Sequence, residues 1–209
     1  MFNSMLINDG RPYGLGILAS YPLNSGLYDD NGRFPDLLKT GPLQFTSNPV
    51  PNTGKFWAGT FNTAATFLRN PPALNVAMQG IDQWTIRFDN VAVSTGSVAN
   101  NELYTQDNNF VIDRGSIPNG IRFFGSDFAF LSTTTAFTPG ISHSLTVTWN
   151  GITRRLYVDD VLRATDTAPG KMPTPITNQW YGSFRGGGNG WSGWLSSVRV
   201  YNVAKVPPF

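Results

Sequence analysis

Residues 142–165 read SHSLTVTWNGITRRLYVDDVLRAT and carry the clearest strand pattern in the chain. Between Ser144 and Trp149, serine or threonine alternates with leucine, valine and tryptophan, which predicts a strand with one buried face and one face in water. Asn150-Gly151 follows, and this dipeptide favours a tight hairpin turn because both residues tolerate positive φ. Residues 152–158 then predict the returning strand, so the stretch predicts a β-hairpin.

Asp159 and Asp160 lie side by side after that strand. Paired carboxylates can bind a metal or act as acid and base, but they can also form a polar turn. If Val158 pairs with Val161, the two aspartates are the loop residues of a second hairpin. The turn interpretation predicts that Asp160→Gly stabilises the fold by about 0.5–1 kcal/mol without loss of function, because glycine adopts positive φ at less cost.

The same period-two pattern recurs elsewhere in the chain. Trp84, Ile86 and Phe88 alternate with polar residues in QWTIRFDN, and valines alternate with polar residues in SSVRVYNV near the end. Only residues 36–39 and 74–79 are compatible with helix, for about a turn each. Short strands between Gly, Pro, Asn and Ser clusters, without βαβ alternation, predict an all-β antiparallel sandwich or barrel.

Composition narrows the function classes. Of the 209 residues, 40% are hydrophobic, enough for a single core, whereas only 13% are charged, about half the usual share of roughly 25%. The net charge is +2 and the cations are scattered, so no nucleic-acid partner is predicted. The chain has no cysteine, which excludes disulfides and thiolate metal sites.

We predict that residues 1–14 form an N-terminal arm that docks on a neighbouring subunit and that residues 15–209 form a single domain. The N-terminus lacks the basic region and the long apolar region of a signal peptide. No apolar run approaches the roughly 18 residues of a membrane-spanning helix. These features predict a protein made in the host cytoplasm, with no membrane partner.

Several of these segments together resemble the laminin-G-like, concanavalin A-like jelly-roll family. In that family an aromatic strand end precedes Asn/Asp-Gly, here Trp149-Asn150-Gly151, and a strand of the type Leu-Tyr-Val-Asp-Gly follows, here Leu156 to Asp160. The last strand comes after a Gly-containing element, here Trp191 to Leu195, and ends in a Val-x-Val/Ile-Tyr-Asn pattern, here Val198 to Asn202. The resemblance implies a two-sheet antiparallel β-sandwich with the concanavalin A-like jelly-roll topology.

The resembled superfamily includes glucanases, whose retaining members need two carboxylates about 5 Å apart. This chain contains one glutamate, Glu102, and no strand with acids at i, i+2 and i+4. His143, the only histidine, is predicted to cap a backbone group, and no nucleophile elbow is present. No catalytic residue and no enzymatic activity are therefore predicted, and a glycoside hydrolase is kept as the weaker alternative.

Some lectin-like relatives hold Ca²⁺ with loop oxygens, and Asp29, Asp30 and Asn31 in YDDNG are the best candidate ligands here. Ca²⁺ takes about six to eight oxygens, and no distal bidentate glutamate is present, so a plain Asx turn is the favoured interpretation. No other cofactor is predicted.

Four aromatic residues flank the glycine-rich stretch 186–190 and are candidates for stacking on a sugar or a partner protein. Core packing is favoured for each of them, because large aromatic side chains are mostly buried. The candidates are Trp180, Tyr181, Trp191 and Trp194.

The favoured function is a non-enzymatic structural or interaction protein, above all a virion component such as a phage capsid decoration (cement) protein or a head or tail fibre module. The predicted partners are further copies of the chain in a homo-oligomer and a capsid or other virion protein. The predicted location is the virion, with an extracellular location as the alternative. The second hypothesis is a carbohydrate-binding lectin-like module with a glycan partner, which would use the region around residues 180–194.

Overall fold

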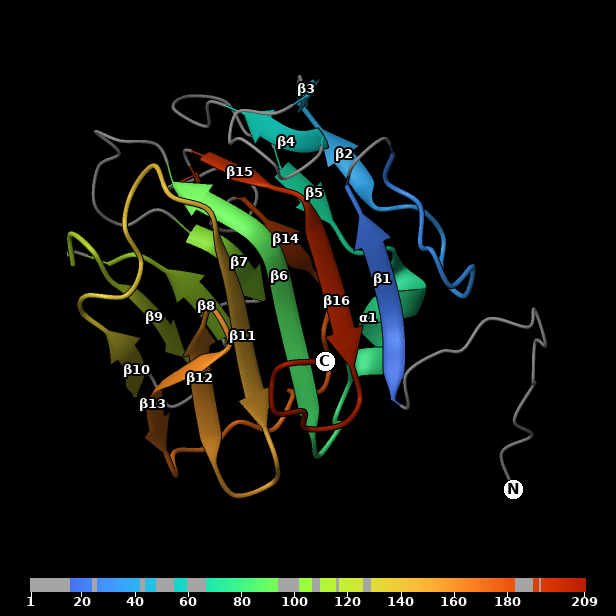
Figure 1. The fold of residues 1–209 in the computed structure, drawn as a ribbon. Coiled ribbons are helices and arrows are strands. Elements are labelled where there is room, and N and C mark those ends of the chain that lie inside the picture. Colours follow the sequence, from blue (N-terminus) through green and yellow to red (C-terminus); the bar gives the residue numbers. More distant parts are fainter. Residues whose placement is uncertain are drawn as a thin grey trace, which may run out of the picture.

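The computed structural model describes residues 16–23, 26–41, 44–47, 55–59, 67–93, 102–106, 110–115, 117–125, 129–182, 190–191 and 193–209, with only the backbone described in 44–47 and 55–59. In these residues two antiparallel β-sheets pack face to face (Figure 1). The predicted all-β sandwich is confirmed. The predicted N-terminal arm, residues 1–14, lies outside the described residues, so the division into arm and domain stays a prediction.

The first sheet has nine strands arranged around the long central strand β6. One edge of β6 leads through β11 and β12 to the edge strand β13, and the other edge pairs with β16 along one half and with β15 along the other. β16 continues to β1, and β15 continues to β4 and β3. The strands are β1 (Ile17–Pro22), β3 (Gln44–Ser47), β4 (Lys55–Gly59), β6 (Trp84–Val93), β11 (His143–Trp149), β12 (Arg154–Val158), β13 (Val161–Asp166), β15 (Gly193–Leu195) and β16 (Ser197–Tyr201).

The second sheet has seven strands and lies behind the first in Figure 1. Its order is β10 (Phe130–Thr133), β9 (Ile121–Phe124), β8 (Phe110–Asp113), β7 (Glu102–Gln106), β14 (Gln179–Tyr181), β5 (Phe67–Arg69) and β2 (Leu38–Thr40). The helical turn predicted at 74–79 lies in α1 (Pro72–Met78), which begins with a proline at its first turn. The helical turn predicted at 36–39 is wrong, because β2 pairs there with β5.

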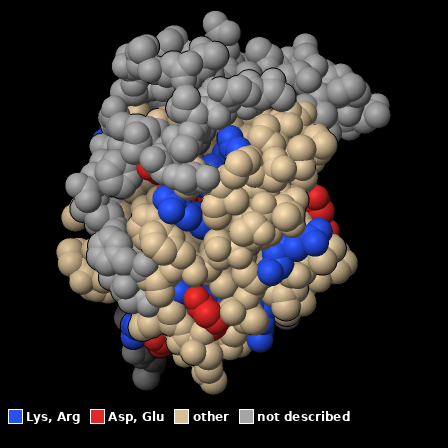
Figure 2. Space-filling model, turned by 90° about the vertical axis from the view of Figure 1, so that its left-hand side faces the viewer, with Lys and Arg blue, Asp and Glu red and all other residues tan. Residues whose placement is uncertain are grey.

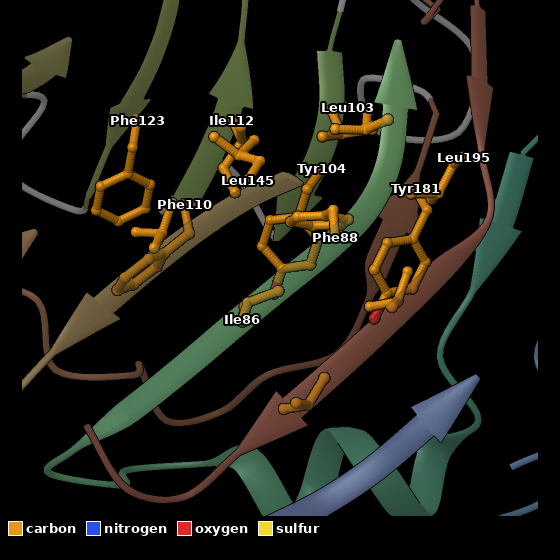
Figure 3. Close-up of a cluster of buried hydrophobic side chains, with 14 of the residues drawn as sticks. Ile86, Phe88, Leu103, Tyr104, Phe110, Ile112, Phe123, Leu145, Tyr181 and Leu195 are labelled. Carbon is orange, nitrogen blue, oxygen red and sulfur yellow. The ribbon is translucent and has the colours of Figure 1, made fainter. Parts of the chain in front are cut away.

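Aromatic and aliphatic side chains from both sheets fill the space between them (Figure 3). The Trp84 ring meets Phe110 and Phe123 edge to face, with centroids 5.7 and 5.8 Å apart, a favoured arrangement for aromatic pairs. Burial raises the pKa of the Tyr181 hydroxyl, against the lowering effect of its hydrogen bond to Asn70. No helix in the described part of the chain is long and apolar enough to cross a membrane.

The outer face of the nine-stranded sheet is not the wet face that the alternation predicts. Thr85 on β6 and Thr146 and Thr148 on β11 are no more than 1% exposed. One reason is the segment after β16, which folds back in front of β6 (Figure 1). Thr85 Oγ1 donates to the Val203 carbonyl at 2.9 Å and accepts from Lys205 N at 2.9 Å. A cover supplied by a distant part of the chain is invisible to period-two analysis.

Candidate functional site

The predicted hairpin at Asp159-Asp160 is confirmed. Val158 pairs with Val161, and both aspartates have positive φ, 52° and 62°. Two positive φ values are typical of the type I′ turn, whose twist matches that of a hairpin. The neighbouring turn differs from its prediction: Trp149 pairs with Arg154, so residues 150–153 form the connection in place of a two-residue turn at Asn150-Gly151.

The Asp159 carboxylate has partners outside the turn. Its Oδ1 accepts from Ser144 N at 2.9 Å, and its Oδ2 lies 2.7 Å from His143 Nδ1. Because Thr138 N donates to His143 Nε2 at 3.1 Å, the network assigns the imidazole proton to Nδ1, which donates to Asp159. The predicted capping role of His143 is confirmed, and this ring links the turn to the segment before β11.

The Asp160 carboxylate pairs with Arg87, a β6 side chain that is only 7% exposed as a residue. Arg87 Nε also donates to Asp89 Oδ1 at 2.7 Å, and Asp89 Oδ2 accepts from Ser197 Oγ at 2.7 Å and Arg199 Nη2 at 2.5 Å. Burial alone would raise the pKa of Asp89, but Arg199, Ser197 and Arg87 together hold it below its usual range. The interpretation of the aspartate pair as a turn and nothing more is therefore wrong.

Asp29 organises its own loop. Its Oδ1 accepts from Ser20 N at 2.9 Å and Asn31 N at 3.2 Å, and its Oδ2 accepts from Arg33 N at 3.0 Å and Phe34 N at 3.1 Å. The bond to Asn31 N is the predicted Asx turn. With both oxygens bound to backbone donors, Asp29 does not fit the role of a Ca²⁺ ligand. The described residues contain no group of three or more His, Asp or Glu side chains placed to hold a metal.

The structure separates the four aromatic candidates. Tyr181 and Trp191 are 0% exposed and belong to the core, as favoured. Trp180 and Trp194 are half-buried. Because successive strand side chains point to opposite faces, Trp180 lies opposite the core residue Tyr181 and Trp194 opposite the core residue Leu195 (Figure 3). The two tryptophans are thus on the outer faces of different sheets, and a joint site is impossible.

Strand register lines up one outward side chain from every strand of the seven-stranded sheet. The residues next to them, among them Tyr104, Phe123 and Tyr181, point into the core in Figure 3. By strand alternation, the row of register partners lies on the outer face. From β2 to β10 the row is Leu38, Arg69, Trp180, Thr105, Val111, Phe124 and Phe130.

Trp180 is half-buried and lies in this row between Arg69 on β5 and Thr105 on β7. Neighbouring strands are about 4.8 Å apart, so the three side chains are adjacent on the outer face of the sheet. Arg69 is half-buried like Trp180, whereas Thr105 is 0% exposed. Arg69 Nε and Thr105 Oγ1 are buried and have no hydrogen-bond partner. We call Arg69, Trp180 and Thr105 the Trp180 patch. The register partners of Trp194 are both alanines, Ala58 and Ala92, and its own Nε1 is buried without a hydrogen-bond partner.

The family of the chain follows from its sequence together with this architecture. The family model described as the concanavalin A-like lectin/glucanases superfamily matches residues 73–208, which is more than half of the chain. The chain belongs to this superfamily. The resemblance inferred from the motifs in 143–202 is therefore confirmed. A comparison with curated proteins gives no match.

Solved structures with the same fold include glycan-binding and receptor-binding domains. Domain 4 of AbnA, a GH43 extracellular arabinanase from Geobacillus stearothermophilus, in complex with arabinotriose, has a TM-score of 0.67 and 15% identity, over 90% of this chain and 93% of that chain. The Ruminococcus gnavus IT-sialidase CBM40 bound to alpha2,3 sialyllactose has a TM-score of 0.57 and 16% identity, over 71% and 91%. The receptor binding domain of botulinum neurotoxin C/D mosaic serotype has a TM-score of 0.64 and 12% identity, over 91% of this chain and 48% of that chain. At such identities the likeness shows the fold alone.

Because the superfamily includes glucanases, whose retaining members use two neighbouring carboxylates, we compared the positions of the acidic side chains. Cross-strand register places Glu102 on β7 opposite Asp113 on β8, a pairing that a search for acids along single strands could not detect. Both residues are at most 5% exposed. Arg122 donates to both oxygens of Asp113, at 2.5 and 2.8 Å, which leaves this carboxylate engaged in an ion pair and unavailable as a free nucleophile or base.

The sequence prediction included Trp180 but missed Arg69 and Thr105. Their strands belong to segments far apart in the chain, and only the pairing of β5, β14 and β7 brings them together. A weak local signal existed, because Arg69 follows the apolar pair Phe67-Leu68 at the outward position of a short strand.

Proposed function

We propose that this protein is a non-catalytic, lectin-like module that binds a glycan on the outer face of the seven-stranded sheet, at the Trp180 patch. The observation that carries the proposal is the half-buried tryptophan placed between two side chains with unpartnered polar atoms. A sugar ring needs an aromatic face for its C–H groups and hydrogen-bonding groups beside it. The half-buried Trp180 supplies the first, and the half-buried Arg69 supplies the second. The arabinotriose and sialyllactose complexes of structures with this fold support the class of ligand.

The test is a glycan array, followed by calorimetric titration of the best ligand with three variants. Trp180→Ala should weaken binding at least about tenfold, and Trp180→Phe should keep part of it, because a ring remains. Trp194→Ala is the matched control, since it removes a half-buried tryptophan from the opposite outer face and should leave the affinity unchanged. Binding to no glycan, or an equal loss in both alanine variants, would overturn the proposal.

Absence of catalysis is part of the proposal and is tested in the same samples. Incubation of the protein with its bound glycan should release no new reducing ends over a day. Release that disappears in Glu102→Gln would show a glycoside hydrolase instead.

The virion role, the homo-oligomer and the virion or extracellular location remain proposals drawn from composition. Glycan binding is compatible with each of them, because a lectin-like module can be displayed on a particle or secreted. Light scattering of the pure protein, together with copurification with particles, tests these proposals. A monomer that associates with no particle would contradict them without touching the glycan proposal.

A further inference from the structure

Among the described residues, Arg69 is a cation without a counter-ion on the outer face of the seven-stranded sheet, one strand from its edge. Its register partners are Leu38 and Trp180, and it is the only charged residue in the row that crosses the seven strands. Its Nε is buried and has no hydrogen-bond partner, and no carboxylate of the described residues pairs with it. A buried donor on a charged group that has no partner carries a free-energy cost, which an incoming acceptor relieves.

Two other arginines in or directly after strands of the described seven-stranded sheet, Arg122 and Arg114, have partners of their own. Arg122 is bound to Asp113 at both oxygens and lies 4.7 Å from the centroid of the Phe130 ring. Its hydrogen bond to Asp113, more than any other contact, raises the pKa of Arg122. Arg114 is 5% exposed and its guanidinium donates to the Pro118 carbonyl, although its Nε, like that of Arg69, is buried without a partner. Arg69 is more exposed and is the register partner of Trp180, so it is the cation that an anionic ligand at the Trp180 patch would meet.

We propose that the glycan bound at the Trp180 patch carries a carboxylate and that Arg69 binds this group while Trp180 stacks on the sugar ring. The inference rests on the proposed function. A guanidinium presents two parallel N–H groups that match the two oxygens of a carboxylate, which a neutral hydroxyl cannot use equally well. The spacing of adjacent strands, about 4.8 Å, places the cation beside the ring platform, as the acid group of a sugar lies beside its ring.

The test compares ligands that differ only in the charge of one group. The first step is an array that contains uronic-acid oligosaccharides with their methyl esters and sialylated oligosaccharides with their asialo forms. We expect the acidic member of a pair to bind about tenfold or more tightly than its neutral counterpart. Raising the NaCl concentration should weaken the acidic ligand and leave the neutral one nearly unaffected.

Variants of Arg69 separate the failure of this inference from the failure of the proposed function. Arg69→Gln should remove the preference for the acidic member and its salt dependence, while the weaker binding of the neutral member persists; Arg69→Lys should restore part of the preference. Arg163→Gln, which removes an exposed cation on β13, is the matched control and should change nothing. Equal binding of both members, or a preference that survives Arg69→Gln, would overturn the inference and leave glycan binding standing if it still depends on Trp180. Binding to no glycan would remove both.

Discussion

The outer face of the nine-stranded sheet carries Arg87, Arg199, Asp89 and Asp160 in one continuous set of ion pairs, whereas the row across the seven-stranded sheet carries Arg69 alone. In this network every charge has an opposite charge within contact distance, and the segment after β16 adds a cover. On the second face a cation and a tryptophan lie side by side without an acid in their row. Removing one partner of a buried ion pair destabilises a fold, because the other charge is left buried without compensation, whereas a charge without a partner is available to a ligand.

On the side of the molecule drawn in Figure 2, basic and acidic groups lie in small separate clusters among uncharged residues. Arg154 is 0% exposed and bound to Asp166 at 2.6 Å. Such an arginine belongs to the structural class of cations, together with Arg87 and Arg199.

The largest effect should come from breaking the closed network at its centre. Asp89→Ala leaves Arg87 and Arg199 without their shared carboxylate, and we expect the free energy of unfolding to fall by about 2–3 kcal/mol, measured by urea denaturation. Asp82→Ala is the control, because Asp82 and its partner Lys171 are mostly exposed and their ion pair should be worth under about 1 kcal/mol. Equal losses in the two variants would show that the network does not stabilise this face.

Lowering the pH should weaken the same network, with a smaller loss of the free energy of unfolding than Asp89→Ala causes. The pKa of Asp89 is lowered in the folded state, so the unfolded chain binds the proton more tightly and stability falls as the pH drops through and below about 4. Asp89→Asn removes this contribution, and its free energy of unfolding should depend less on pH between about 5 and 2 than that of the unmodified protein. Parallel acid profiles for the two proteins would contradict the assignment.

A change at the turn should cost about 1 kcal/mol. Asp160→Gly relieves the positive φ of 62° but removes a partner of the buried Arg87, and a hydrogen bond between charged groups outweighs the backbone gain. This reverses the stabilisation expected from the turn interpretation alone. Thermal and urea unfolding of this variant measure the sign directly, and an increase in stability would show that the Arg87 contact contributes little.

The smallest effect on stability is expected at Arg69. Because Arg69 has no carboxylate partner among the described residues, Arg69→Gln should change the free energy of unfolding by less than about 0.5 kcal/mol. The matched substitution on the other face, Arg87→Gln, should cost at least about 2 kcal/mol, because Arg87 contacts both Asp89 and Asp160. Similar changes in the free energy of unfolding for the two variants would show that Arg87 stabilises the fold no more than Arg69 does.

Local features of the sequence predicted local features of the fold. The Val158–Val161 hairpin and the alternation in β6 and β11 depend on neighbouring residues, and both were predictable. Long-range pairing was not. Whether Trp180 and Trp194 share a surface depends on which sheet takes β14 and which takes β15, and whether Thr85 is wet depends on a segment near residue 205. The sequence placed one residue of the Trp180 patch among its candidates, and strand register supplied the other two.

The most direct test of the central claim is a map of backbone and indole amide shifts as the best glycan is titrated into ¹⁵N-labelled protein. The account predicts that the largest shifts lie at Arg69, Trp180 and Thr105, including the Trp180 indole N–H, with the Trp194 indole unchanged. The largest shifts at Trp194, at the Asp159-Asp160 turn, or on the nine-stranded sheet as a whole would contradict it.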